Sequence, residues 1–115
     1  AVTALSEKAI HQAVIGHWRA FGVPGSLVAT LPNYRAFGQA GLTKGLPDLI
    51  VLSPTLGDKT GFLELKKVGG LLSEAQADFG QLCHMRGIPW AVSYGRDEPI
   101  TILETWGAVK AMVRQ

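Results

Sequence analysis

The stretch GFLELKK, residues 61–67, has the apolar letters of a buried β-strand but carries charges inside it. Side chains alternate between the two faces of a strand, so Glu64 and Lys66 point to the same face, beside Phe62. Packing alone would favour valine and isoleucine at these positions. We therefore expect a strand that presents a carboxylate and an ammonium group side by side.

The preceding apolar run, DLIVL at residues 48–52, lies between two prolines and predicts a second strand, buried on both faces. A short turn separates the two runs, so we expect them to pair as a hairpin that brings Asp48 beside Glu64 and Lys66. Two close carboxylates raise each other's pKa unless a cation lies between them. Oxygen ligands of this kind suit a hard ion, and Mg²⁺ with its retained waters is the expected occupant.

Helical periodicity, capping residues and turn residues predict the other elements. The expected order is helix, three strands, helix, strand, helix. A hairpin followed by a helical crossover to another strand gives a mixed sheet with helices on its faces, which is an α/β fold. The expected segments are a helix at 6–20, a strand at 27–31, a glycine-rich loop at 34–47, a helix at 73–86, a strand at 89–94, and a helix at 99–113. Two alternatives stay open for this last segment: an interruption at Gly107, and a strand for its first part, ITIL.

Length and composition limit the class of protein. The 115 residues, 47% of them hydrophobic, fit one domain over 1–115. No run approaches the roughly 20 apolar residues of a membrane helix, and no secretion signal is seen. The single cysteine, Cys83, excludes an internal disulfide framework and a cysteine-based zinc site, so a reduced, cytoplasmic setting is the simplest fit. A net charge of +2 permits nucleic-acid binding without requiring it.

Two further polar residues fall on helix faces that are expected to point inward. Glu7 lies in the apolar stripe with Ile10 and Val14, where it either compensates the helix dipole or faces a cation. Gln76 lies on the inward flank of the helix at 73–86, where a satisfied core amide is the simpler interpretation. Their coincidence with the charged residues of the hairpin favours one shared site.

Taken in order, the motifs GLPDLIVL, GFLELKK and GLLSEAQADF resemble the virus-type replication–repair nuclease (VRR-Nuc) domain of the PD-(D/E)xK nuclease superfamily. The family pattern is a glutamate on the first helix, then G-x-P-D, then an E-x-K strand, then a helix that opens with glutamine. The E-x-K motif alone matches by chance, whereas all four in order are specific. The matching positions are Glu7, Gly45 to Asp48, Glu64 to Lys66, and Gln76.

The resemblance covers nearly the whole chain and implies a restriction-endonuclease-like core that hydrolyses DNA phosphodiester bonds with Mg²⁺ or Mn²⁺. Lys66 would orient the attacking water and stabilise the charge on the phosphorane, and Gln76 would position Lys66 or a phosphate oxygen. Asp48 and Glu64 would bind the ion directly, and Glu7 directly or through water. The implied metal ligands are therefore Glu7, Asp48, Glu64 and the backbone carbonyl of Leu65.

Basic residues near this site are candidates for contacts with the DNA backbone. Arg35, Lys44 and Lys67 flank it in the sequence, although each alone is more simply a solvated surface charge. The three histidines show no metal-ligand spacing, and we assign none of them to catalysis.

These observations lead to a metal-dependent, structure-selective DNA endonuclease as the expected function. Stand-alone members of the family resemble junction-resolving enzymes, so Holliday junctions or other branched DNA are the expected substrates. One small domain offers one active site, and two symmetric cuts would need a homodimer. The alternatives are a non-catalytic nucleic-acid-binding module that retains the fold, and an unrelated α/β domain whose charges form a structural network.

Overall fold

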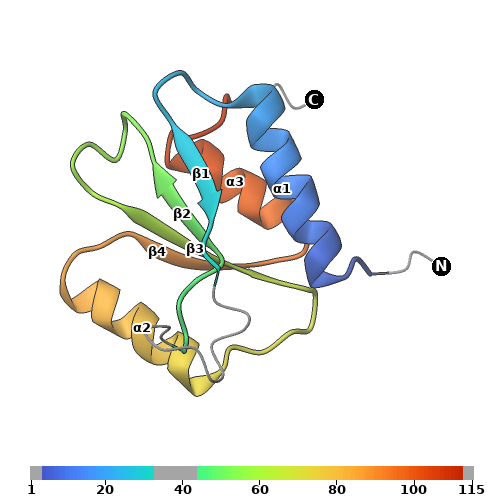
Figure 1. The fold of residues 1–115 in the computed structure, drawn as a ribbon, viewed down its shortest axis with the longest axis vertical. Helices are drawn as coiled ribbons and strands as arrows, with labels where there is room; N and C mark the ends of the chain where they lie inside the picture. Colours follow the sequence, from blue (N-terminus) through green and yellow to red (C-terminus); the bar gives the residue numbers. More distant parts are fainter. Residues whose placement is uncertain (1–3, 33–43, 113–115) are drawn as a thin grey trace.

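The computed structural model describes residues 4–32 and 44–112, and within them a four-stranded sheet is flanked by three helices (Figure 1). The predicted order of elements and the α/β class are confirmed. The elements are α1 (Glu7–Phe21), β1 (Leu27–Thr30), β2 (Leu49–Leu52), β3 (Gly61–Lys66), α2 (Glu74–Met85), β4 (Trp90–Tyr94) and α3 (Asp97–Thr105).

The sheet has the strand order β1-β2-β3-β4, with three antiparallel strands and a parallel pair, β3 and β4, joined through α2. The predicted hairpin forms between β2 and β3, where Leu49 pairs with Leu63. One step further along this register, Asp48 lies opposite Glu64. Residues directly opposite each other on neighbouring strands share a face, so the hairpin sets both acids on the same side of the sheet.

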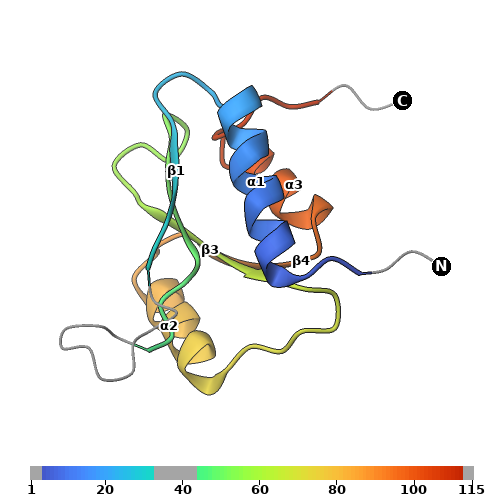
Figure 2. The ribbon, with the colours of Figure 1, turned by 45° about the vertical axis from the view of Figure 1, so that its right-hand side comes forward.

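Alternation along β3 separates two environments. Leu63 and Leu65 point into the core, which α1 and α3 cover from one side of the sheet (Figure 2). Phe62 points to the other face, where its ring meets Phe79 of α2 edge-on, with 5.2 Å between ring centroids. Glu64 shares the face of Phe62. The core residues are Ile10, Val14, Val28, Leu49, Val51, Leu63, Leu65, Ile100, Leu103, Ala108 and Val109.

The first two helices begin at the predicted serines. Ser6 accepts a hydrogen bond from the backbone of Ala9, and Ser73 caps α2 through Gln76. A serine oxygen at this position satisfies a backbone N–H group that has no partner inside the helix. The caps therefore fix where Glu7 and Gln76 stand relative to the sheet.

Burial of β2 differs from the prediction. Leu49 and Val51 are buried in the core, but Ile50 is half-buried and Leu52 is 40% exposed. One face of β2 is covered rather than two, because α2 packs mainly against β4 at one end of the sheet.

The last helix is shorter than expected and starts earlier. It begins at Asp97, with Pro99 in the first turn, where a missing N–H group leaves no hydrogen bond unmade. Gly107 adopts a left-handed conformation, φ 72°, and the chain then turns back so that Val109 bridges Gly22. The helix ends at Thr105, so the alternative of a break at Gly107 is confirmed, whereas a helix that continues to residue 113 and a strand for ITIL are wrong.

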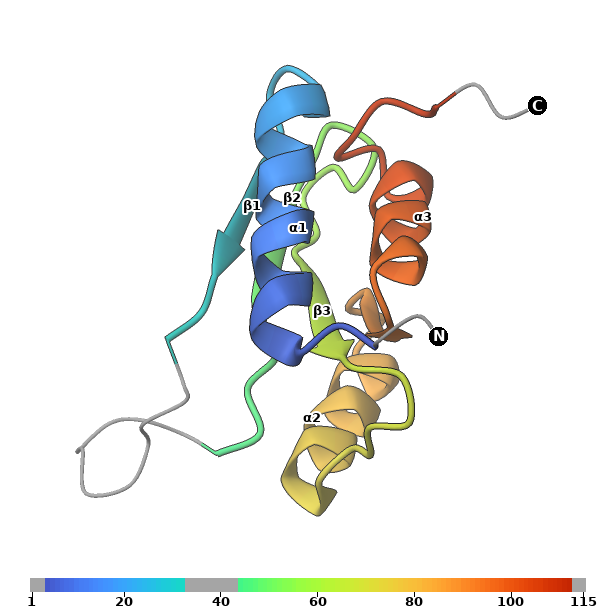
Figure 3. The same cartoon turned by 90° about the vertical axis from the view of Figure 1, so that its right-hand side faces the viewer.

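Figure 3 shows α2 at one end of the molecule, away from α1 and α3. In the part of the chain that the structure describes, no helix is long and apolar enough to cross a membrane. Most of the predicted glycine-rich loop, and with it the predicted DNA contact at Arg35, lies outside the described residues.

Candidate active site

Asp48 and Glu64 meet where the β2–β3 hairpin opens. Asp48 directly precedes β2, and its Oδ2 accepts a hydrogen bond of 2.7 Å from the backbone N–H of Leu65. Glu64 is 2% exposed, and the Asp48 carboxyl lies close enough to perturb its titration. The two acids that the sequence placed side by side are therefore together in the structure.

The G-x-P-D segment is held against α2 by its glycine. Gly45 has φ 87°, and a Cβ atom there would collide with the backbone and side chain of Ala75 in the first turn of α2. Only glycine adopts this conformation readily and allows so close an approach. Pro47 is fully buried, and the backbone carbonyl of Asp48 accepts a hydrogen bond from Leu31. These contacts aim the Asp48 side chain at β3.

Glu64 is a strongly perturbed acid. Burial is the main cause that raises its pKa from 4.5 to about 9, and hydrogen bonding and charge at Asp48 raise it further. Lys66, on the same face of β3, lowers this pKa, whereas Glu7 raises it. When Glu64 is ionised, its buried Oε2 has no hydrogen-bond partner among the described residues. A proton shared with Asp48 resolves this conflict, and a bound cation would resolve it equally well.

Gln76 connects α2 to the site. Its backbone N–H and its side-chain oxygen form a reciprocal capping box with Ser73, at 3.1 and 2.8 Å. The remaining side-chain nitrogen donates a hydrogen bond of 3.1 Å to Oε1 of Glu64. The contact seen is thus to Glu64, and the expected role of Gln76 toward Lys66 or a phosphate stays a prediction.

Glu7 stands at the edge of the site rather than inside it. The residue is exposed in the first turn of α1, and its Oε2 accepts a 3.4 Å hydrogen bond from the backbone N–H of Lys67, just beyond β3. This contact ties the start of α1 to the end of the E-x-K strand. Both interpretations that the sequence left open stay predictions, because Glu7 lies in the first turn of α1, where an acid compensates the helix dipole, and its side chain also reaches the end of the E-x-K strand.

A cavity of about 630 Å³ opens beside Asp48, on the α1 side of the sheet, and neither Glu64 nor Lys66 lines it. It contains three of the predicted metal ligands, Glu7, Asp48 and Leu65, and it adds His11, which the sequence had assigned no role. The available signal was the spacing of four residues between Glu7 and His11, which places both on one face of a helix. The lining residues are Glu7, Lys8, His11, Gln12, Thr30, Leu31, Asp48 and Leu65.

The donor set fits a lightly held hard cation. Within residues 4–32 and 44–112, no three histidine, cysteine, aspartate or glutamate side chains are close enough to surround an ion by themselves. Mg²⁺ usually retains several waters and is held by one or two carboxylates together with substrate phosphates. Asp48 and Glu64 lie together, and Oε2 of Glu64 has no hydrogen-bond donor among the described residues. The two carboxylates thus match the small number of protein ligands that Mg²⁺ needs.

The structure describes two of the three basic residues that were predicted to contact DNA. Lys44 is exposed directly before Gly45, and Lys67 is exposed at the end of β3. Both are thus accessible beside the acidic pair, as a contact with a DNA backbone requires.

Comparison with known proteins gives one family and a shared fold. The model of the VRR-NUC domain family matches residues 8–97, starting one residue after Glu7. A solved VRR_NUC domain has a TM-score of 0.64 and 22% identity, covering 88% of this chain and 97% of its own. A solved VRR_NUC domain protein has a TM-score of 0.74 and 19% identity, covering 91% and 90%. No curated protein matches this chain.

Proposed function

The chain belongs to the VRR-NUC domain family, which implies a function of the nuclease type, and on that premise we propose that it is a metal-dependent, structure-selective DNA endonuclease. The observation that carries the proposal is the buried Glu64 beside the half-buried Asp48, an electrostatic conflict that a divalent cation would relieve. A charge network that only stabilised the fold would not need an acid with a pKa near 9.

The acids would hold Mg²⁺ or Mn²⁺ with few protein ligands. Asp48 and Glu64 bind it directly, the backbone carbonyl of Leu65 adds an oxygen, and Glu7 acts from the edge of the cavity, directly or through water. When bound, such an ion polarises a phosphoryl oxygen and lowers the pKa of a coordinated water. Gln76 keeps the Glu64 carboxylate in place through its hydrogen bond.

Lys66 is the catalytic residue in this proposal. It shares a face of β3 with Glu64, is half-buried, and lies near enough to lower the pKa of that acid. From this position its ammonium group orients the attacking water and stabilises the negative charge that grows on the phosphate. In this role Lys66 stabilises charge and keeps its own proton throughout the reaction.

The substrate in this proposal is branched DNA, including Holliday junctions, and the active form is a homodimer with one site for each cut. Lys44, Lys67 and Arg35 contact the phosphate backbone and fix its register without reading bases. Sedimentation that shows a monomer at high concentration while both strands of a junction are cut together would remove the dimer.

Cleavage assays test the proposal directly. Branched, flap and linear DNA are incubated with Mg²⁺, Mn²⁺ or EDTA, using the wild type, Lys66→Ala, and Lys110→Ala as a control that removes an exposed lysine next to the Phe21 end of α1. Metal-dependent cutting lost only in Lys66→Ala supports an endonuclease. Binding of DNA without cutting in any metal supports the alternative, a non-catalytic binding module.

A further inference from the structure

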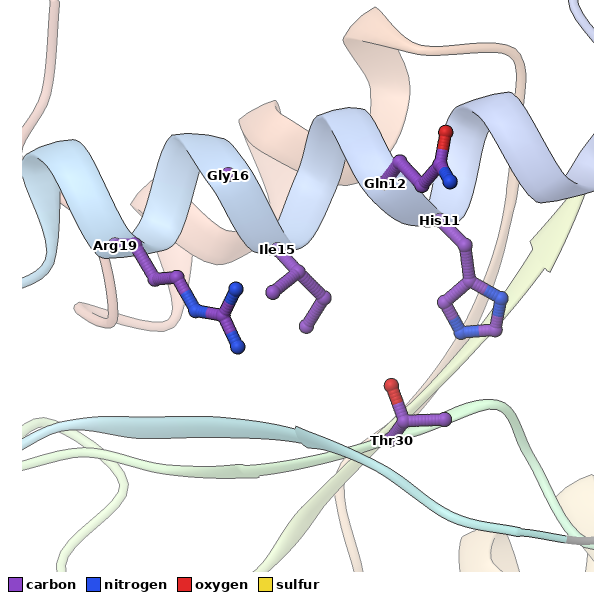
Figure 4. A pocket seen from close by; sticks show the side chains of 6 residues that line it. All are labelled: His11, Gln12, Ile15, Gly16, Arg19 and Thr30. Atoms are coloured by element: carbon purple, nitrogen blue, oxygen red, sulfur yellow. The ribbon is translucent and has the colours of Figure 1, made fainter.

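A second cavity of about 340 Å³ continues the active-site cavity along α1. The two cavities share His11, Gln12 and Thr30, so a continuous surface leads away from Asp48 between α1 and the edge strand β1. The lining residues of the second cavity are His11, Gln12, Ile15, Gly16, Arg19 and Thr30 (Figure 4). We call the joined surface the α1–β1 groove.

One face of α1 supplies the helical wall of this groove. Lys8, His11, Ile15 and Arg19 follow each other at spacings of three and four residues, which places them on one stripe. Figure 4 shows Arg19 and His11 leaning toward β1, where the hydroxyl of Thr30 faces α1. None of the described residues that line the second cavity is acidic. The part of the groove away from Glu7 and Asp48 therefore offers hydrogen-bond donors and positive charge to a ligand.

Gly16 has no reason inside the protein to be glycine. It lies in the middle of α1, where glycine weakens a helix, and a Cβ atom there would meet nothing within 4 Å. By contrast, Cβ atoms at Gly22 and Gly80 would collide with Trp18 and Trp90. The bare backbone at Gly16 leaves the groove open to close approach from outside.

His11 provides an independent indication of a ligand. Its Nε2 is buried, yet it has no hydrogen-bond partner among the described residues. A buried polar nitrogen left alone costs stability, so a partner outside the described residues is expected, and a bound ligand would supply one. A ligand rich in acceptor oxygens that carries negative charge along its length would satisfy both His11 and Arg19.

We propose that the α1–β1 groove binds the phosphodiester backbone of one unpaired DNA strand next to the scissile bond, with Arg19 and His11 as its contacts. This assignment rests on the proposed nuclease function, because the groove begins at Asp48. Helix α1 contacts β1 and β3 directly, so the groove has a closed floor, and its second cavity of about 340 Å³ is small, which favours a single strand as the occupant. Arg19 also lies in the last turn of α1, where a cation compensates the helix dipole, and the test must separate the two roles.

The length of the groove makes the proposal quantitative. From Lys8 to Arg19 the helix rises about 16 Å, at 1.5 Å per residue. A stacked DNA strand advances about 3.4 Å per nucleotide and an extended strand advances further, so the stripe spans at most roughly five nucleotides. Adding unpaired nucleotides on one side of the cut should strengthen binding up to about that number, and further nucleotides should add little.

The experiment measures binding by fluorescence anisotropy in EDTA, with flaps of increasing length, over a series of salt concentrations. Arg19→Ala should weaken binding about tenfold and reduce the salt slope by about 0.7, as loss of one phosphate contact on a single strand does. Gly16→Ala should weaken binding while raising the melting temperature by about 3 °C, because alanine favours the helix. Arg86→Ala, which removes an exposed charge at the far end of α2, is the matched control and should bind as the wild type does.

The outcomes separate this inference from the proposed function. If Arg19→Ala and Gly16→Ala bind like Arg86→Ala, and flap length has the same effect on all of them, the groove assignment is overturned even where the wild type cuts DNA. If no metal supports cutting but these two variants still lose binding and flap-length dependence, the groove stands and the nuclease proposal fails. Absence of any DNA binding by the wild type overturns the groove assignment.

Discussion

Replacing Glu64 by glutamine tests the electrostatics of the site more directly than any loss of activity. Glutamine has nearly the shape of glutamate, its oxygen can still accept from Gln76, and its nitrogen can donate to Asp48. Glu64→Gln therefore keeps the hydrogen bonds of the protonated acid and removes the buried charge. The variant should fold without a metal and should not cut DNA.

The effect on stability has a definite sign. In the unfolded chain Glu64 loses its proton near pH 4.5, whereas in the metal-free folded protein it keeps the proton up to about pH 9. Unfolding releases a proton between these values, so the free energy of unfolding falls as the pH rises through this window. Each pH unit costs at most about 1.4 kcal/mol, so moving from about pH 5 to about pH 8 removes roughly 4 kcal/mol.

Urea denaturation in EDTA, followed by circular dichroism at several pH values, measures this loss. The wild type should lose stability toward pH 8, and Glu64→Gln should lose roughly 4 kcal/mol less over the same range. Mg²⁺ should then restore stability to the wild type at pH 8, by about 1.4 kcal/mol at ten times its dissociation constant, and have no such effect on the variant. Parallel pH profiles for the two proteins would refute the assignment of Glu64 as a buried acid with a raised pKa.

The other predictions concern the neighbours of this acid. Lys66→Ala should reduce cutting at least about 100-fold while Mg²⁺ still raises the melting temperature, since its role is catalytic; loss of both effects would make it a structural residue. Ser73→Ala should cost about 1 kcal/mol of stability through the lost cap. Gln76→Ala should cost about 1–3 kcal/mol more, because Glu64 loses its donor, and equal unfolding midpoints for the two variants would contradict this. Gly45→Ala should destabilise the fold by more than about 1 kcal/mol in urea denaturation and also slow cutting, since Ala75 blocks the added methyl group; wild-type values in both assays would count against that packing.

Periodicity and turn chemistry were sufficient to predict the arrangement of the sheet. The hairpin of β2 and β3 follows from two short apolar runs and one short turn, and its register brings Asp48 opposite Glu64. The start of α3 was missed because Pro99 was taken as the first residue of a helix, whereas proline also fits within a first turn. Exposure of Leu52 depends on how much of the sheet α2 covers, which no local pattern records.

The site was predictable as a set of residues but not as a set of contacts. The order of the motifs identified Gln76. The sequence does not show that this one side chain both completes the capping box with Ser73 and donates a hydrogen bond to Glu64. His11 and Arg19 were missed for a different reason. A groove exists only where two packed elements leave a gap, so the distance between α1 and β1 decides it.

The same contacts explain why a small domain tolerates a charge conflict in its sheet. Leu65 donates its backbone N–H to Asp48, and Gln76 donates to Glu64, so each acid is held by one neutral donor. These donors fix the carboxyl groups in position without neutralising them. In the proposed function a proton and a metal ion compete for the space between Asp48 and Glu64, so metal binding should strengthen as the pH rises. The stability that the metal-free protein loses at alkaline pH is the free energy that a bound cation can recover.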